Sequence, residues 1–162
     1  MPRECGECTA CCEGWLESAR MQMHPGKPCQ HLAQGRCSIY PDRPDHPCRS
    51  FECGWKLPGS PLPDDMRPDR CGAIVILGPD WYEWKVLRAV PAGWTIPEQT
   101  LQRIKRFAQS RKLALIYHEF EQAEGKLVRT HKVGFGPPEF VAAFRVAMKN
   151  AGEEETPPSL FG

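Results

Sequence analysis

Residues 5–12 read CGECTACC, and this stretch decides how the first third of the chain folds. It holds four of the nine cysteines of a 162-residue protein, and the others are Cys29, Cys37, Cys48, Cys53 and Cys71. A segment rich in cysteine and proline, with few apolar runs, has little to pack around. We therefore expect residues 1–56 to form loops and short helices that are held together by something other than a hydrophobic core.

The rest of the sequence restricts what these thiols do. Residues 1–14 are polar and lack the apolar stretch of a secretory signal, so we expect a cytoplasmic protein in a reducing compartment. No run approaches the roughly 18 apolar residues of a transmembrane helix, which argues against a membrane partner. Because the number of cysteines is odd and the compartment is reducing, the thiols are expected to bind metal rather than to form disulfides.

The spacing of the first cysteines fits one face of a helix. If 8–20 is helical, Cys8, Cys11 and Cys12 share a face, and Cys5 lies near the N-terminus, where the helix dipole favours thiolates. Four more thiols follow within 29–53. Eight thiols fit two zinc sites with four thiolates each, and they equally fit one 4Fe-4S cluster with spare ligands. The predicted metal ligands are Cys5, Cys8, Cys11, Cys12, Cys29, Cys37, Cys48 and Cys53, with Cys71 and His31 as further candidates.

A family resemblance rests on the same residues. The matching pieces, in order, are Cys5-x2-Cys8-x2-Cys11-Cys12, Cys29-Gln30-His31-Leu32, Cys37-Ser38-Ile39-Tyr40, Arg43-Pro44 and Cys48-Arg49-x-Phe51-x-Cys53. This pattern over residues 5–55 resembles the bacterial CxxCxxCC family of the YkgJ type, which is named for chelation of zinc or iron. One departure is the three-residue spacer before Cys48, where the family has two. A related segment in flagellin lysine N-methylases implies an iron–sulfur cluster.

The composition changes near residue 71. After a proline-rich connector at 57–70, residues 71–150 show the pattern ββαββα. Strands are expected at 73–77, 81–87, 113–120 and 126–133, and helices at 97–112 and from 137 onward. The fold class is therefore α+β: a metal-bound cysteine-rich segment packed on a small antiparallel sheet with helices on one face. A mobile tail is expected at 151–162.

Three functions compete. The first is a metal-binding protein with a possible protein partner, in which a saturated zinc site is structural. The second is an iron–sulfur enzyme or enzyme subunit of the methylase-associated type. The third is a nucleic-acid-binding zinc module, suggested by the basic helix at 103–112 but disfavoured by a net charge of +1. Arg43 and Arg49 are expected to offset thiolate charge, and His118 and His131 to be surface or hydrogen-bonded residues.

Overall fold

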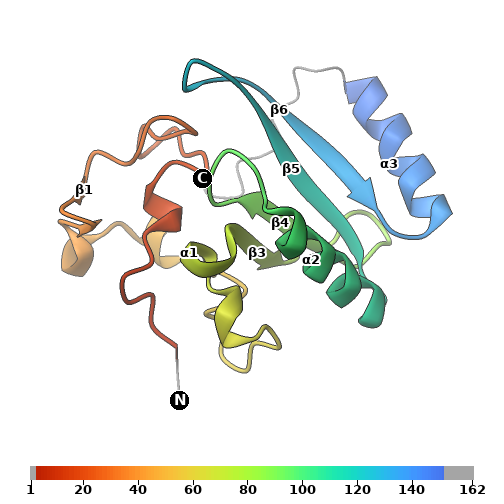
Figure 1. Ribbon diagram of the computed structural model, residues 1–162, viewed down its shortest axis with the longest axis horizontal. Helices are drawn as coiled ribbons and strands as arrows, with labels where there is room; N and C mark the ends of the chain where they lie inside the picture. Colours follow the sequence, from red (N-terminus) through yellow and green to blue (C-terminus); the bar gives the residue numbers. More distant parts are fainter. Residues whose placement is uncertain (1–2, 152–162) are drawn as a thin grey trace.

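The computed structural model describes residues 3–151 and shows an α+β protein (Figure 1). A cysteine-rich segment without long elements lies beside a four-stranded sheet. The elements of the first 71 residues are η1 Ala10–Cys12, β1 Leu32–Ala33, β2 Arg36–Cys37, η2 Tyr40–Asp42, η3 Asp45–Arg49, η4 Asp64–Met66 and α1 Pro68–Cys71. The later ones are β3 Ala73–Leu77, β4 Val86–Pro91, α2 Glu98–Ser110, β5 Ala114–Ala123, β6 Lys126–Phe135 and α3 Pro138–Ala151.

The cysteine-rich segment consists of loops and short helices, as predicted, but the helix expected at 8–20 is wrong. Only η1 is helical there, and it is a short 3-10 turn. The helix stops because Gly14 takes a positive φ of 98°, and its Cα lies so close to the backbone of His24 that no side chain fits. The chain then folds back on itself, since Ser18 pairs with Met23 as an isolated bridge.

The junction between the two segments, the proline-rich connector expected at 57–70, is partly helical. Residues 64–71 contain η4 and α1, and Cys71 is the last residue of α1. Proline at the first helical position favours this short helix, and Gly72 ends it with a φ of 82°. Of the tail predicted at 151–162, only Ala151, the last residue of α3, falls within the described part of the chain.

The sheet is mixed, with strand order β3-β4-β5-β6, so the expectation of an antiparallel sheet is wrong at one pairing. The β3/β4 and β5/β6 pairs are antiparallel, but β4 and β5 are parallel. The reason is α2, which lies between β4 and β5 in the chain. A helical crossover returns the chain in its original direction and so aligns the two strands in parallel.

The two long helices cover opposite faces of the sheet, which corrects the expectation of helices on one face. On the α2 side, the Lys105 ammonium lies 5.7 Å from the ring centroid of Tyr117. On the other side, Phe140 and Phe144 of α3 form an apolar cluster with Ile116. Both faces need cover because four consecutive residues of β5, 114–117, are buried, and strand side chains alternate between faces.

Trp81 and Trp84 belong to a turn rather than to the second strand, which begins only at Val86. The two tryptophans pair with each other as an isolated bridge, and Tyr82 between them takes a positive φ. Their rings pack edge-on against Phe140 of α3, with centroid distances of 5.7 and 5.5 Å. The aromatic run therefore supplies core contacts for α3 instead of extending the sheet.

The cysteine-rich segment packs against the free edge of β3, as the predicted fold class requires. The backbone N–H of Gly54 donates a hydrogen bond of 2.8 Å to the Val75 carbonyl oxygen. One hydrophobic core joins the two segments, since it holds Cys53 and Trp55 together with Val75 and Leu87. The thiols are thus anchored to the sheet by both backbone and side-chain contacts.

Candidate metal centre

All nine cysteines are free thiols in the structure. Cys29, Cys53 and Cys71 are buried, and the other six are partly buried. The eight predicted ligands come from η1 and its flanking loops, from the loop before β1, from β2, from η3 and from the loop after η3. Long elements do not hold these thiols, so their positions depend on short turns and on contacts between loops.

A first thiol group, Cys5, Cys8, Cys11 and Cys53, brings the start of the chain to the edge of the sheet. Burial raises the pKa of Cys11 well above its usual value, and the largest further contribution comes from Cys53, more than forty residues away in sequence, followed by Cys12, Cys5 and Cys8. Burial likewise raises the pKa of Cys53, and Cys8 and Cys5 add to the rise. These mutual effects indicate that the four thiols lie in one region of the protein.

A second thiol group, Cys12, Cys29, Cys37 and Cys48, lies next to the first. Burial raises the pKa of Cys12 to about 12, with further contributions from the thiols of Cys37, Cys29 and Cys48 and last from Cys5. Burial also raises the pKa of Cys48, and Cys29 and Cys37 again add to it. The Cys29 backbone N–H donates a hydrogen bond of 2.8 Å to the Cys12 carbonyl oxygen, which holds two members of this group together.

Backbone amides lie against one or more thiols in each group. The His31 N–H donates to Cys29 Sγ at 3.5 Å. Burial raises the pKa values of Cys8 and Cys53. Each thiol also receives a hydrogen bond from the backbone of the residue two positions later in the chain, which lowers its pKa. Amides aimed at sulfur stabilise the thiolate, which is the form that binds metal.

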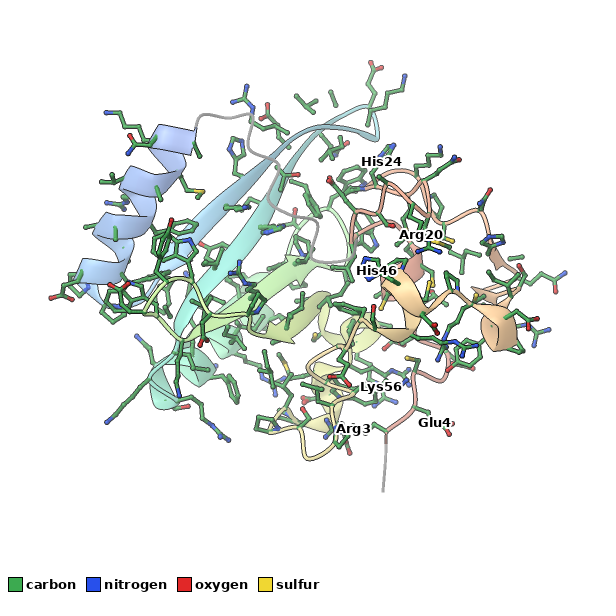
Figure 2. The ribbon with its side chains drawn as sticks, turned by 180° about the vertical axis from the view of Figure 1, so that it is seen from behind. Arg3, Glu4, Arg20, His24, His46 and Lys56 are labelled. Carbon is green, nitrogen blue, oxygen red and sulfur yellow. The ribbon has the colours of Figure 1, made fainter. Side chains whose placement is uncertain are left out.

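Two arginines place positive charge beside the second group. Burial and the neighbouring thiols raise the pKa of Cys48, whereas Arg43 and Arg20 lower it. Figure 2 labels Arg20 on this part of the molecule. Arg43 stacks on the Tyr40 ring at 3.9 Å, and its buried Nε has no hydrogen-bond partner among residues 3–151. An unsatisfied cationic donor beside thiols suits a site that carries net negative charge.

The thiols of each group are neighbours, but they are not arranged as a complete set of metal ligands. In the described part of the chain, no three His, Cys, Asp or Glu side chains are placed to hold one metal ion. The donor chemistry, eight clustered thiols with amides and arginines nearby, fits zinc or an iron–sulfur cluster. The thiols would have to move together on binding, which is common where metal binding is coupled to folding.

The two further candidate ligands, His31 and Cys71, are placed less favourably for binding a metal. His31 reaches a thiol only through its backbone N–H, within residues 3–151. The Cys71 Sγ is buried and donates to the carbonyl oxygens of Met66 and Ala73, at 3.4 and 3.3 Å. Burial raises the pKa of this thiol, and Cys8 contributes only a minor further rise. These contacts already account for Cys71 as a structural residue of the junction.

The basic helix α2 uses several of its charges within the protein. Arg103 forms an ion pair with Asp65 at 2.9 Å, and Lys105 lies over the rings of Tyr117 and Phe135. Arg111 lies over Phe107. Contacts of this kind occupy side chains that a nucleic-acid interface would need for phosphates.

Two hollows open elsewhere on the surface. One, of about 270 Å³, lies between η3 and the end of β3 and is lined in part by His46, Ser50 and Glu52. The other, of about 600 Å³, lies between α3 and the tryptophan turn. Neither is lined by a cysteine, so neither opens onto the thiol groups. Figure 2 shows His46 on the cysteine-rich side of the molecule.

The two histidines of the β5/β6 hairpin differ. His131 is exposed and lies 3.3 Å from the Glu121 carboxylate, as predicted for a surface histidine. His118 is partly exposed, and within the described residues its ring forms no hydrogen bond. The two rings also lie on opposite faces of the sheet, since His118 pairs with Lys132 and His131 with Glu119.

Comparison with protein-family models, with curated proteins and with solved structures finds no match for this chain. Within residues 3–151, no helix combines the length and the apolar character needed to cross a bilayer.

Proposed function

We propose that the eight cysteines at 5–53 bind zinc or an iron–sulfur cluster through their thiolates, and that the protein is of the CxxCxxCC type. The observation that supports this most directly is that thiols from separate loops, short helices and β2 gather into two neighbouring groups of four. Their spacing and order along the chain resemble the family pattern. The role that follows for zinc is structural, because four thiolates leave no open position on the ion.

The local environment suits this role. Four thiolates around zinc leave a net negative charge, and Arg20 and Arg43 beside the second group offset it. Burial raises the pKa of Cys11 well above its usual value and that of Cys12 to about 12, so both thiols are protonated at neutral pH without metal, and metal binding must displace their protons. Such binding supplies folding free energy, on the order of 10 kcal/mol in small zinc peptides. A loop-rich segment with few long elements needs a contribution of that kind.

The test is metal content after purification without oxygen. We expect zinc or iron in near-stoichiometric amount by elemental analysis, and a brown protein with visible absorption if the metal is an iron–sulfur cluster. Cys53→Ser should lower the metal content, whereas Cys71→Ser, the matched buried control outside both groups, should leave it unchanged. A wild-type protein that holds neither metal, and takes up neither when refolded with zinc or with iron and sulfide, contradicts the proposal.

The same measurement separates the structural and the redox alternatives. Colourless protein with stoichiometric zinc supports the structural role. A cluster that bleaches on reduction favours an iron–sulfur enzyme or enzyme subunit, which would need a partner, because residues 3–151 show no cofactor fingerprint beside the thiols.

A further inference from the structure

The larger of the two surface hollows, about 600 Å³ in volume, lies between α3 and the tryptophan turn, residues 81–84. Two backbone hydrogen bonds between Trp81 and Trp84, of 3.0 and 2.9 Å, close this turn. The opposite wall is largely one face of α3, formed by Ala143, Val146, Ala147 and Asn150. The volume is within the range of pockets that hold small ligands.

The tip of the turn is not explained by the packing of α3. Trp81 and Trp84 pack against Phe140, whereas Tyr82 is 80% exposed. Tyr82 also has a φ of 52°, which glycine or asparagine adopts more easily in a two-residue turn. Val146, in the facing wall, is 58% exposed. Exposed apolar surface gathered around a hollow indicates a binding site.

Aromatic rings form a corner at one side of the hollow. The ring centroids of Trp81 and Tyr82 lie 4.8 Å apart, and the two ring planes are nearly perpendicular, at 88°. Trp84 lines the same hollow. The face of an aromatic ring carries partial negative charge, so a cation in this corner is attracted by more than one ring.

The charge of the hollow is negative as well. Glu83 is the only charged side chain that lines it among the described residues. Glu83 is exposed, and within residues 3–151 no hydrogen bond or ion pair engages its carboxylate. The nearest basic residues in sequence, Lys85, Arg145 and Lys149, do not line the hollow. Those on α3 project from the other side of the helix.

We propose that this hollow binds a small organic cation, a molecule that carries a methylated ammonium group. The charge of such a group would face the aromatic rings and Glu83, and its methyl groups would contact the apolar wall at Val146 and Met148. A hydrated metal ion gains nothing from an apolar wall, and an anion is repelled by Glu83 and by the ring faces. No cysteine lines the hollow, so this site does not depend on the proposed metal binding.

The experiment follows the five tryptophans by fluorine NMR in full-length protein labelled with fluorotryptophan. Choline chloride replaces sodium chloride stepwise at constant ionic strength, and each signal is assigned by replacing one tryptophan by phenylalanine. We expect saturable shifts of the Trp81 and Trp84 signals. Trp15 and Trp94, which pack against each other and do not line the hollow, are internal controls and should not shift saturably.

A neutral analogue separates charge from shape. In this alcohol a carbon atom replaces the nitrogen of choline, so the molecule keeps its shape and loses its charge. It should bind about threefold or more weakly than choline, because the attraction to the rings and to Glu83 is lost. Equal affinity for the two molecules would mean that the hollow is a general apolar surface, and it would overturn the proposal.

Variants identify the groups that bind. Tyr82→Leu keeps an apolar side chain but removes the ring, and it should weaken choline binding by about threefold or more. Glu83→Gln should weaken it by about twofold or more. Glu124→Gln, at an exposed glutamate of the β5/β6 turn, is the matched control and should leave the affinity unchanged. Circular dichroism shows whether each variant is folded, and either of the first two carries the test if the other does not fold.

Three results would contradict the site itself. The first is the absence of saturable shifts at Trp81 and Trp84. The second is choline binding by folded Tyr82→Leu as tight as that of wild type. The third comes from analytical ultracentrifugation: a dimer of the wild type that Tyr82→Leu dissociates would show that a second copy of the chain covers the hollow.

Discussion

Cys11 and Cys12 are consecutive in the chain, but their thiols belong to different groups. The thiol that acts most on Cys11 is Cys53, and the one that acts most on Cys12 is Cys37. Both residues lie in η1, a 3-10 turn in which successive side chains point about 120° apart. Adjacent cysteines therefore connect the start of the chain to two separate loops.

This division predicts different effects for two neighbouring serine variants. If each group holds its own metal, Cys11→Ser and Cys12→Ser each remove about half of the bound metal, and the double variant removes nearly all of it. Elemental analysis of the purified variants measures this. Complete loss in both single variants would indicate one shared site.

The same division can be tested without metal. Mild oxidation of the metal-free protein should link Cys11 to Cys53 and Cys12 to Cys37 or Cys29 before it links across the groups, because disulfides form between the nearest thiols. Peptide mapping by mass spectrometry identifies the bonds. Equal yields of Cys11–Cys37 and Cys11–Cys53 would contradict the two groups.

The contact between Gly54 and β3 predicts a sensitive position beside the first thiol group. A Cβ at residue 54 would lie 2.6 Å from the Val75 carbonyl oxygen, which is backbone and cannot rotate away. Gly54→Ala should lower the free energy of unfolding by about 1–3 kcal/mol and increase alkylation of the buried Cys53. Urea denaturation and mass spectrometry measure the two effects.

Glu52→Ala is the control for this variant, since residue 52 is exposed on the same loop and should change stability by less than about 0.5 kcal/mol. Equal stability of Gly54→Ala and Glu52→Ala would mean that the segment does not depend on this contact.

A hydrogen bond from Thr100 connects α2 to the junction between the two segments, and its loss should lower the free energy of unfolding. The buried Thr100 hydroxyl donates to the Cys71 carbonyl oxygen at 2.6 Å. Thr100→Val keeps the shape but removes the donor, so we expect a loss of about 1–3 kcal/mol in the free energy of unfolding. Ser110→Ala removes an exposed hydroxyl that donates to the Phe107 carbonyl oxygen, and it should cost less than about 0.5 kcal/mol. Thermal or urea unfolding of both variants makes the comparison.

The lowered pKa of His118 predicts a loss of stability in acid. Burial, with Lys132 and Arg88, sets this pKa at about 4 in the folded protein, against about 6.5 in the unfolded chain. The unfolded state binds the proton first, so stability is full above pH 6.5 and falls as the pH drops towards 4, by up to about 3 kcal/mol.

His118→Gln should flatten that part of the stability–pH profile, and His131→Gln, on the exposed face, should leave it in place. Urea unfolding between pH 4 and 7 distinguishes them. Identical slopes for wild type and His118→Gln would show that His118 does not titrate in this way.

Much of the second segment could be predicted from the sequence because local pattern decides it. The period of Leu101, Ile104 and Ala108 predicted α2 to within about two residues of its ends. The turn at Glu124 and Gly125 between apolar runs predicted the β5/β6 hairpin. The helix expected at 8–20 was wrong because cysteine spacing alone does not reveal the positive φ of Gly14.

The sequence by itself determined which chemistry is available: eight thiols, crowded into 49 residues with prolines and few apolar runs, whose pattern indicates metal binding. Only the tertiary structure decided how those thiols divide, that β4 and β5 run parallel, and that the tryptophan turn lies against α3. The physical reason is the range of the interactions involved. Composition and spacing act along the chain, whereas strand register and loop packing join residues far apart in sequence, whose proximity no local pattern encodes.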